Sequence, residues 1–158
     1  RRKTFVLHKE AIDLQNTLTE IAEEQRMKAK KQVDIHIKVV PDNLRVNADR
    51  QHFMQIVSNI CDNAVKYSHE EVRIDIFCTK DTEGNVVIII SDNGIGISKA
   101  HQQHIFDKFY RVPNKNLHDV KVYGLGLYYV ATTMRLHGGT DSVESERGKG
   151  TKFKLLFR

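Results

Sequence analysis

The sequence has little of what disulfide-bonded and membrane-spanning proteins depend on. It contains two prolines, no tryptophan and two cysteines, Cys61 and Cys78, in 158 residues. Because these cysteines form neither a paired-thiol motif nor a zinc-ligand spacing, we expect buried thiols in a reducing compartment. The longest apolar run, Val86–Ile90, is far shorter than the roughly 20 residues of a membrane-crossing helix. We therefore expect a soluble chain with about one domain's worth of core.

The chain carries only a mild excess of positive charge. The 25 Lys and Arg residues against 20 Asp and Glu give a formal charge of +5, and no basic stripe interleaved with aromatics is present. No nucleic-acid partner is expected. The basic run Lys28–Lys31 is interpreted as the solvated end of a helix, where positive charge suits the helix dipole. The sequence begins at Arg1 rather than Met, and we expect it to be a piece of a longer protein.

Glycine is concentrated at three places. Six of the nine glycines form Gly-x-Gly pairs, at Gly94 and Gly96, Gly124 and Gly126, and Gly148 and Gly150. Glycine tolerates positive φ and close backbone approach, and neighbouring glycines let N–H groups converge on an anion. One such pair is typical of a turn. Three pairs in one chain indicate phosphate binding.

Periodicity predicts helices that alternate with antiparallel strands in an α+β sandwich. Asp49 is the expected N-cap of a long helix that ends near Tyr67, and the turn at 81–85 predicts a hairpin. A long mobile loop is expected over 97–123, with a short helix at 98–105. The remaining expected strands are 4–8, 33–39, 44–48, 72–79, 86–91, 140–146 and 152–157, and the remaining helices begin at 14 and span 125–137.

On the 49–67 helix, Asn59, Asn63 and Lys66 lie beside the apolar face rather than opposite it. They would border a cleft. Carboxamide oxygens are hard ligands that suit Mg²⁺, and an ammonium group nearby suits triphosphate oxygens. Taken alone, the three residues favour a solvated helix rim.

Asp92 directly follows the most apolar strand and precedes Asn93-Gly94-Ile95-Gly96. A carboxylate there can accept a hydrogen bond from an exocyclic amine, which distinguishes adenine from guanine. Alone, this sequence is a common turn. With the asparagine helix before it and Gly124-Leu125-Gly126 after it, the pattern favours a purine pocket.

Five ordered motifs together resemble the ATP-binding catalytic domain of bacterial sensor histidine kinases. They are Asn59–Ser68, Asp92–Gly96, Phe106–Arg111, Gly124–Leu127 and Gly148–Thr151. The resemblance runs from about Phe5 to Phe157. It implies one catalytic domain over 1–158 with the Bergerat fold of the gyrase, heat-shock chaperone and mismatch-repair ATPases. That fold is a two-layer α/β sandwich, with a mixed, mostly antiparallel sheet, helices on one face and an ATP lid, here about 97–123.

The resemblance also implies ATP and Mg²⁺ as cofactors and assigns roles to single residues. Asn59, Asn63, Lys66 and Arg111 would be catalytic, with Asn63 as the Mg²⁺ ligand and Asp92 as the acceptor from the adenine amine. The residues that it places at the nucleotide are Asn59, Asn63, Lys66, Tyr67, Asp92, Gly94, Gly96, Ile97, Phe109, Arg111, Gly124, Leu125, Gly126, Leu127 and Thr151. The chain departs from the family pattern at Lys108, where arginine is frequent, and at Val122-Tyr123, where small residues are usual. Both departures concern contacts of the lid.

The family's phosphate-accepting histidine, followed by an acidic residue and shortly by proline, is absent. His69-Glu70 comes nearest but lacks the proline, and His101 with His104 would need a third ligand to hold a metal. The resemblance therefore implies transfer to a histidine of a helical dimerisation domain of the same kinase, and from there to a response regulator. It also implies a monomeric isolated domain, located in the cytoplasm as part of a membrane-anchored bacterial sensor. The alternatives are another Bergerat ATPase, an anti-sigma-type serine kinase and a nucleotide-binding pseudokinase.

Overall fold

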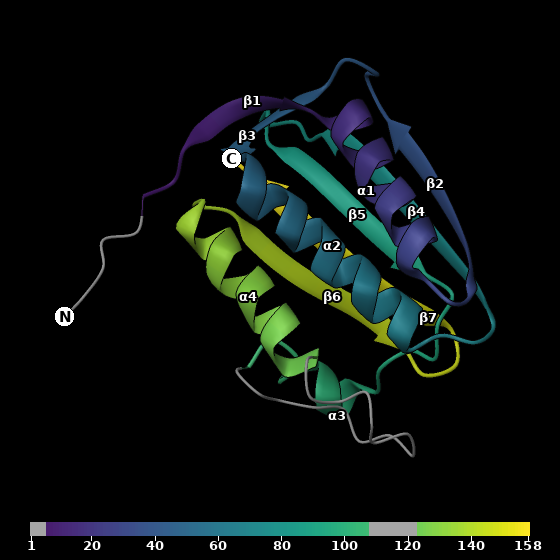
Figure 1. Ribbon diagram of the computed structural model, residues 1–158. Helices are drawn as coiled ribbons and strands as arrows, with labels where there is room; N and C mark the ends of the chain where they lie inside the picture. The colour runs from purple at the N-terminus through teal and green to yellow at the C-terminus, as the bar shows by residue number, and fades with distance from the viewer. Residues whose placement is uncertain (1–5, 108–122) are drawn as a thin grey trace.

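The computed structural model describes residues 6–107 and 123–158. Figure 1 shows two layers, in which three long helices lie across one face of a five-stranded sheet. The helices are α1 (Leu14–Lys28), α2 (Arg50–Lys66) and α4 (Tyr123–Leu136), and a short helix, α3 (Lys99–Gln102), lies near the beginning of α4. Helix α2 is the central helix, because it packs against both α1 and α4.

The large sheet has the strand order β2-β4-β5-β7-β6. Its strands are β2 (Gln32–Val39), β4 (Glu71–Lys80), β5 (Val86–Asp92), β7 (Gly150–Phe157) and β6 (Thr140–Glu146). Strand β2 pairs with β4 in parallel, and the other pairs are antiparallel. Strands β1 (Lys9–Asp13) and β3 (Arg45–Asp49) form a separate antiparallel pair at one end of the molecule (Figure 1). The mixed, mostly antiparallel sheet with helices on one face confirms the predicted fold.

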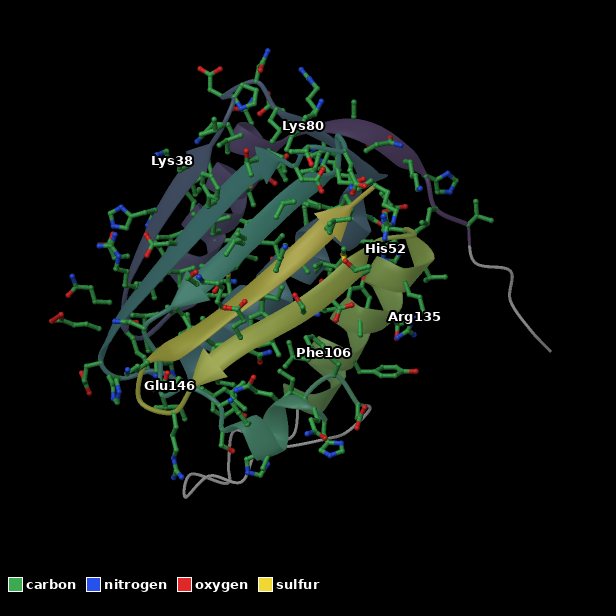
Figure 2. The ribbon with its side chains drawn as sticks, turned by 180° about the vertical axis from the view of Figure 1, so that it is seen from behind. Lys38, His52, Lys80, Phe106, Arg135 and Glu146 are labelled. Carbon is green, nitrogen blue, oxygen red and sulfur yellow. The ribbon has the colours of Figure 1, made fainter. Side chains whose placement is uncertain are left out.

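The core lies between the helices and the sheet because the strands alternate. In β4, Ile74 and Ile76 are buried while Arg73 is exposed, and β7 alternates in the same way. Helix α2 presents to this layer the apolar face that its spacing predicts, with Phe53, Ile56, Val57, Ile60 and Ala64 buried. Figure 2 shows the other face of the sheet, over which no described helix lies.

Both ends of α2 match the sequence prediction. Asp49 is its N-cap, and the carboxylate accepts a hydrogen bond from the backbone N–H of His52 at 3.1 Å. The helix ends at Lys66, with Tyr67 as the C-cap. The predicted hairpin is also confirmed as β4 and β5, and the expected strands 33–39, 44–48, 140–146 and 152–157 are found within about two residues of their predicted bounds. Cys61 and Cys78 are free and buried, and burial raises the pKa of each thiol to about 12.

Two predicted elements are wrong in position or length. The first strand is β1 at Lys9–Asp13 rather than 4–8, because its place is set by antiparallel pairing with β3, from Lys9 opposite Asp49 to Asp13 opposite Arg45. The helix expected at 98–105 is only α3, since Ser98 makes no side-chain cap bond and the chain continues in turns from 103. Most of the lid expected over 97–123 lies outside the described residues. No helix among those described is long and apolar enough to span a membrane.

Candidate functional site

Two hollows adjoin the C-terminal end of α2. The inner hollow, between α2 and the ends of β5 and β7, encloses about 20 Å³ and is lined by Asn63, Ala64, Tyr67, Asp92, Ile95, Gly96, Ile97, Thr151 and Phe153. The outer hollow encloses about 510 Å³ and is lined by Gln25, Lys28, Ala29, Lys30, Lys31, Asn59, Asp62, Asn63, Val65, Lys66 and Gly126. Asn63 lines both hollows, whereas the predicted carboxylate of Asp92 lines the inner one and Asn59 and Lys66 line the outer one.

Asn63 lies near the end of α2 and is buried, with 8% of its surface exposed. Its Nδ2 is the one buried side-chain polar atom in the described part of the chain that has no hydrogen-bond partner. Buried polar atoms are nearly always bonded in folded proteins, so this orphan, whose residue lines both hollows, is a candidate contact for a bound molecule. The carboxamide also carries an oxygen of the kind Mg²⁺ accepts.

Asp92 ends β5 and faces the inner hollow. Its Oδ1 accepts a hydrogen bond from the backbone N–H of Gly94 at 2.8 Å. Burial raises the pKa of this carboxyl group, although hydrogen bonds from the backbone N–H groups of Gly94 and Thr151 act in the opposite direction. The side chain is therefore a half-buried acceptor at the wall of the cavity.

The walls of the inner hollow depend on two glycines with positive φ. A Cβ atom on Gly150 (φ 94°) would lie 2.0 Å from the carbonyl oxygen of Asp92, and one on Gly96 (φ 77°) would lie 2.1 Å from that of Glu146. No L side chain fits at either place. Gly150 therefore allows close backbone packing beside Asp92. The N–H of Gly148, its partner in the third glycine pair, donates to the carbonyl of Ile95 at 2.7 Å, so it does not face an anion as the sequence suggested.

A hydrogen-bond network around Ser145 was not predicted. Its Oγ accepts from the backbone N–H of Ile97 at 2.7 Å, donates to the carbonyl of Gly150 at 2.8 Å and lies 2.8 Å from Oγ1 of Thr151. Gln102 from α3 donates to the carbonyls of both Ile97 and Ser145, each at 2.7 Å. These bonds hold the segment after Gly96 against the wall that carries Thr151. No motif marked Ser145 or Gln102, because their partners come from other elements.

The outer hollow contains the remaining polar residues of α2. Asn59 donates from Nδ2 to the carbonyl of Gly126 at 3.3 Å and accepts from Gln55 at 2.7 Å, so its amide links α2 to α4. Lys66, the last residue of α2, is half-buried in the same hollow. Asn59, Lys66 and Gly126 are thus brought together, while Leu127 is buried in the core and lines neither hollow.

Other predicted positions are less informative. Gly124 and Leu125 lie in the first turn of α4, and Phe109, Arg111 and Lys108 lie outside the described residues. Phe106, labelled in Figure 2, packs edge-on against Phe153 with ring centroids 6.0 Å apart. Among the residues described, no three His, Cys, Asp or Glu side chains are grouped to hold a metal. His104 instead lies 3.1 Å from a carboxylate oxygen of Asp107.

Comparison with known proteins gives consistent relationships. Sensor protein RprX of Bacteroides fragilis is 46% identical over 111 residues, which cover 70% of this chain and 21% of RprX. The mycobacterial sensor histidine kinase MprB has the same fold, with a TM-score of 0.80 at 23% identity over 94% of this chain and 97% of the MprB chain. Full-length ShkA in complex with AMPPNP gives a TM-score of 0.82 at 25% identity, over 98% of this chain and 32% of ShkA.

The chain spans about a fifth of the length of RprX. A family profile matches residues 48–158, which contain all the parts that line the inner hollow: the end of α2, the end of β5 with the segment after it, and the beginning of β7. The matched family is the histidine kinase-, DNA gyrase B- and HSP90-like ATPases, and the chain belongs to it.

Proposed function

We propose that this chain is the ATP-binding catalytic domain of a sensor histidine kinase, which transfers the γ-phosphoryl group of ATP to a histidine on a separate helical dimerisation domain. One observation carries the proposal: Asp92 and Asn63, whose amide nitrogen is buried without a partner, line the same hollow. The names of the relatives support the kinase assignment over other ATPases. RprX is a sensor protein and MprB is a sensor histidine kinase.

The inner hollow is the proposed adenine site. The Asp92 carboxylate accepts from the exocyclic amine, while Ile97 and the ring of Tyr67 supply apolar walls. Thr151 adds a hydroxyl group that Ser145 orients. At about 20 Å³ the hollow has room for about one water molecule, so these walls separate when a purine enters.

The outer hollow is the proposed phosphate side. Asn63 offers its carboxamide oxygen to Mg²⁺, and Lys66 directs its ammonium group to phosphate oxygens. Asn59, bonded to Gly126, fixes the approach of α4 to α2 on this side. When bound, Mg²⁺-ATP supplies the γ-phosphoryl group and the divalent charge. The residues of this chain contribute positioning and charge neutralisation, which are the main requirements of phosphoryl transfer.

The remaining family roles extend this proposal. Arg111 approaches the γ-phosphate from the lid, Phe109 packs the lid, and Gly124 and Gly126 present backbone N–H groups to phosphates. The partners are the phosphoacceptor domain of the same kinase and a response regulator. The domain is monomeric when isolated and works on the cytoplasmic side of a membrane-anchored sensor.

The test is to mix the domain with a helical acceptor domain from a related sensor kinase and γ-labelled ATP. The expected product is an acceptor with an acid-labile, base-stable phosphate, which is typical of phosphohistidine. The control is the same acceptor with its histidine replaced, which should remain unlabelled. Acid-stable label would favour a serine kinase. Tight ATP binding without transfer to any acceptor tested would favour a nucleotide-binding module.

A further inference from the structure

Lys31 is part of the basic run that the sequence suggested was a solvated helix end. It lies instead after α1, just before β2, and is half-buried. Its ammonium Nζ lies 2.8 Å from the carbonyl of Val65, 3.1 Å from the carbonyl of Ser68 and 3.4 Å from Oγ of Ser68. All three acceptors belong to the C-terminal end of α2 and the residues that follow it.

These contacts decide what Lys31 does in the outer hollow. It lines that hollow together with Lys66, and by position alone both are candidates to bind a phosphate. A lysine ammonium has three N–H donors, and for Lys31 three acceptors of the protein are already within hydrogen-bond distance. Its charge also offsets the negative end of the α2 dipole. Lys31 therefore has no donor left for a ligand.

Neighbouring contacts connect α1 to the same part of α2. Asp62 of α2 accepts from Gln25 at 2.9 Å and forms an ion pair with Lys28 at 2.9 Å. Gln25 is buried in the described structure, with 1% of its surface exposed. The last two turns of α2 are thus held from the α1 side by Gln25 and Lys28 and at the helix end by Lys31.

The end of α2 in turn positions the inner hollow. Tyr67 lies between the two residues that Lys31 bonds; its N–H donates to the carbonyl of Asn63, and its carbonyl accepts from the N–H of Ile95, both at 3.0 Å. Asn63, Tyr67 and Ile95 all line the inner hollow. Movement of the helix end would therefore displace one wall of the proposed adenine site together with the proposed metal ligand.

We propose that Lys31 is a positioning residue for the nucleotide site, which acts through the C-terminal end of α2 and does not bind phosphate itself. This inference rests on the proposed function, because it assigns adenine to the inner hollow and the phosphates to the outer one. It predicts a pattern that a phosphate-binding lysine would not give: loss of Lys31 weakens the binding of adenosine and of the Mg²⁺-ATP analogue by the same factor.

The experiment compares Lys31→Met with Lys30→Met, a change at the exposed neighbour that lines the same outer hollow. Calorimetric titration with adenosine and with Mg²⁺-AMPPNP should show that Lys31→Met lowers the affinity for both ligands by about fivefold, the equivalent of about 1 kcal/mol. Lys30→Met should be within twofold of the wild type for adenosine. Lys31→Arg, which keeps the charge and the donors, should recover most of the affinity. Lys66→Met is the contrast, since it should weaken AMPPNP far more than adenosine.

Hydrogen exchange without nucleotide provides the second measurement. The amides of Tyr67 and Ile95 should exchange about fivefold faster in Lys31→Met than in the wild type. Their exchange rates should be unchanged in Lys30→Met. A loss confined to AMPPNP, or unchanged affinity and exchange, would overturn the positioning role. If the wild type binds neither ligand, the proposed function fails, yet the exchange result still decides whether Lys31 holds the helix end. Should Lys31→Met be unfolded by circular dichroism, Lys31→Gln is measured against the same criteria.

Discussion

The two ends of α2 differ in whether their buried polar groups have partners within the protein. At the N-terminal end, the Asp49 carboxylate accepts from the backbone N–H groups of His8 at 2.9 Å and His52 at 3.1 Å. The N–H of Asp49 donates to Nε2 of His137 at 3.1 Å, and Nδ1 of His137 donates to the carbonyl of Thr133 at 2.8 Å. The buried polar groups of this end bond one another across β3, α2 and α4.

At the C-terminal end the polar groups surround two hollows. The amide of Asn63 has an unpartnered buried nitrogen, and burial raises the pKa of the facing Asp92 carboxyl group. Such groups raise the free energy of the empty protein, because a buried polar atom without a bond costs about 1 to 3 kcal/mol. The N-terminal network therefore fixes the helix, whereas the C-terminal groups keep unmet hydrogen-bonding capacity beside the two hollows, as the proposed nucleotide site requires.

The largest expected effect is at the ligand end. Asp92→Asn replaces the acceptor that faces the proposed adenine amine with an amide, which also donates. We expect the affinity for ATP, measured by calorimetry, to fall roughly 100-fold, the equivalent of about 3 kcal/mol. The free energy of unfolding without nucleotide should not fall, since the buried charge is removed. Wild-type affinity in this variant would contradict the pocket assignment.

At the other end, His137→Leu should reduce stability and spare binding. The change leaves the N–H of Asp49 without its acceptor in a buried place and removes the edge contact between His137 and Phe157. We expect urea denaturation to show a loss of about 2 kcal/mol. The exposed His69→Leu variant, the matched control, should change stability by less than about 0.5 kcal/mol. A drop in ATP affinity of the folded His137→Leu protein would mean that the two ends are coupled.

Much of the fold could be predicted because its signals are local. The face of α2 follows from spacing within one helix, and the β4–β5 hairpin follows from two alternating runs and the turn between them. Strand β1 was misplaced because its bounds depend on β3, which pairs with it from a distant part of the chain. Its own residues, Lys9 to Asp13, contain little alternation, and only Ile12 is buried.

The candidate site shows the same difference between local signals and contacts with distant parts of the chain. The residue types and motif context of Asn63 and Asp92 predicted a shared site, and the structure places both at the inner hollow. Lys31 and Ser145 could not be predicted, because their importance lies in partners from other elements: Val65 and Ser68 for Lys31, and Ile97 for Ser145. The basic run was assigned to the dipole of α1, whereas Lys31 bonds the carbonyl end of α2. A charge pattern shows that a cation is present but not which carbonyl groups it will meet.

The smallest expected effect is a difference in pH dependence between Asp49 and Asp92. Burial raises the pKa of Asp49, but hydrogen bonds from His8 and His52 more than offset it, so the pKa lies below its ordinary value. Asp49 therefore stabilises the folded protein at pH values above the pKa of an ordinary aspartate. This stabilisation is lost as the pH falls through the lower pKa that Asp49 has in the folded state. The pKa of Asp92 is raised by burial, so its contribution decreases as the pH rises from the ordinary value through the folded one.

Urea denaturation of the wild type, Asp49→Asn and Asp92→Asn between about pH 3 and 7 separates these cases. The stability advantage of the wild type over Asp49→Asn should grow as the pH rises through the lower part of the range. Its stability relative to Asp92→Asn should decline at higher pH, each change amounting to about 1 kcal/mol or less. Slopes of the same sign for the two variants would contradict the distinction between a carboxylate bonded within the protein and one kept for a ligand. Saturating ATP should not change the pH dependence of the stability difference between the wild type and Asp49→Asn. The Asp49 carboxylate lies at the N-terminal end of α2, where its hydrogen-bond partners belong to the protein itself.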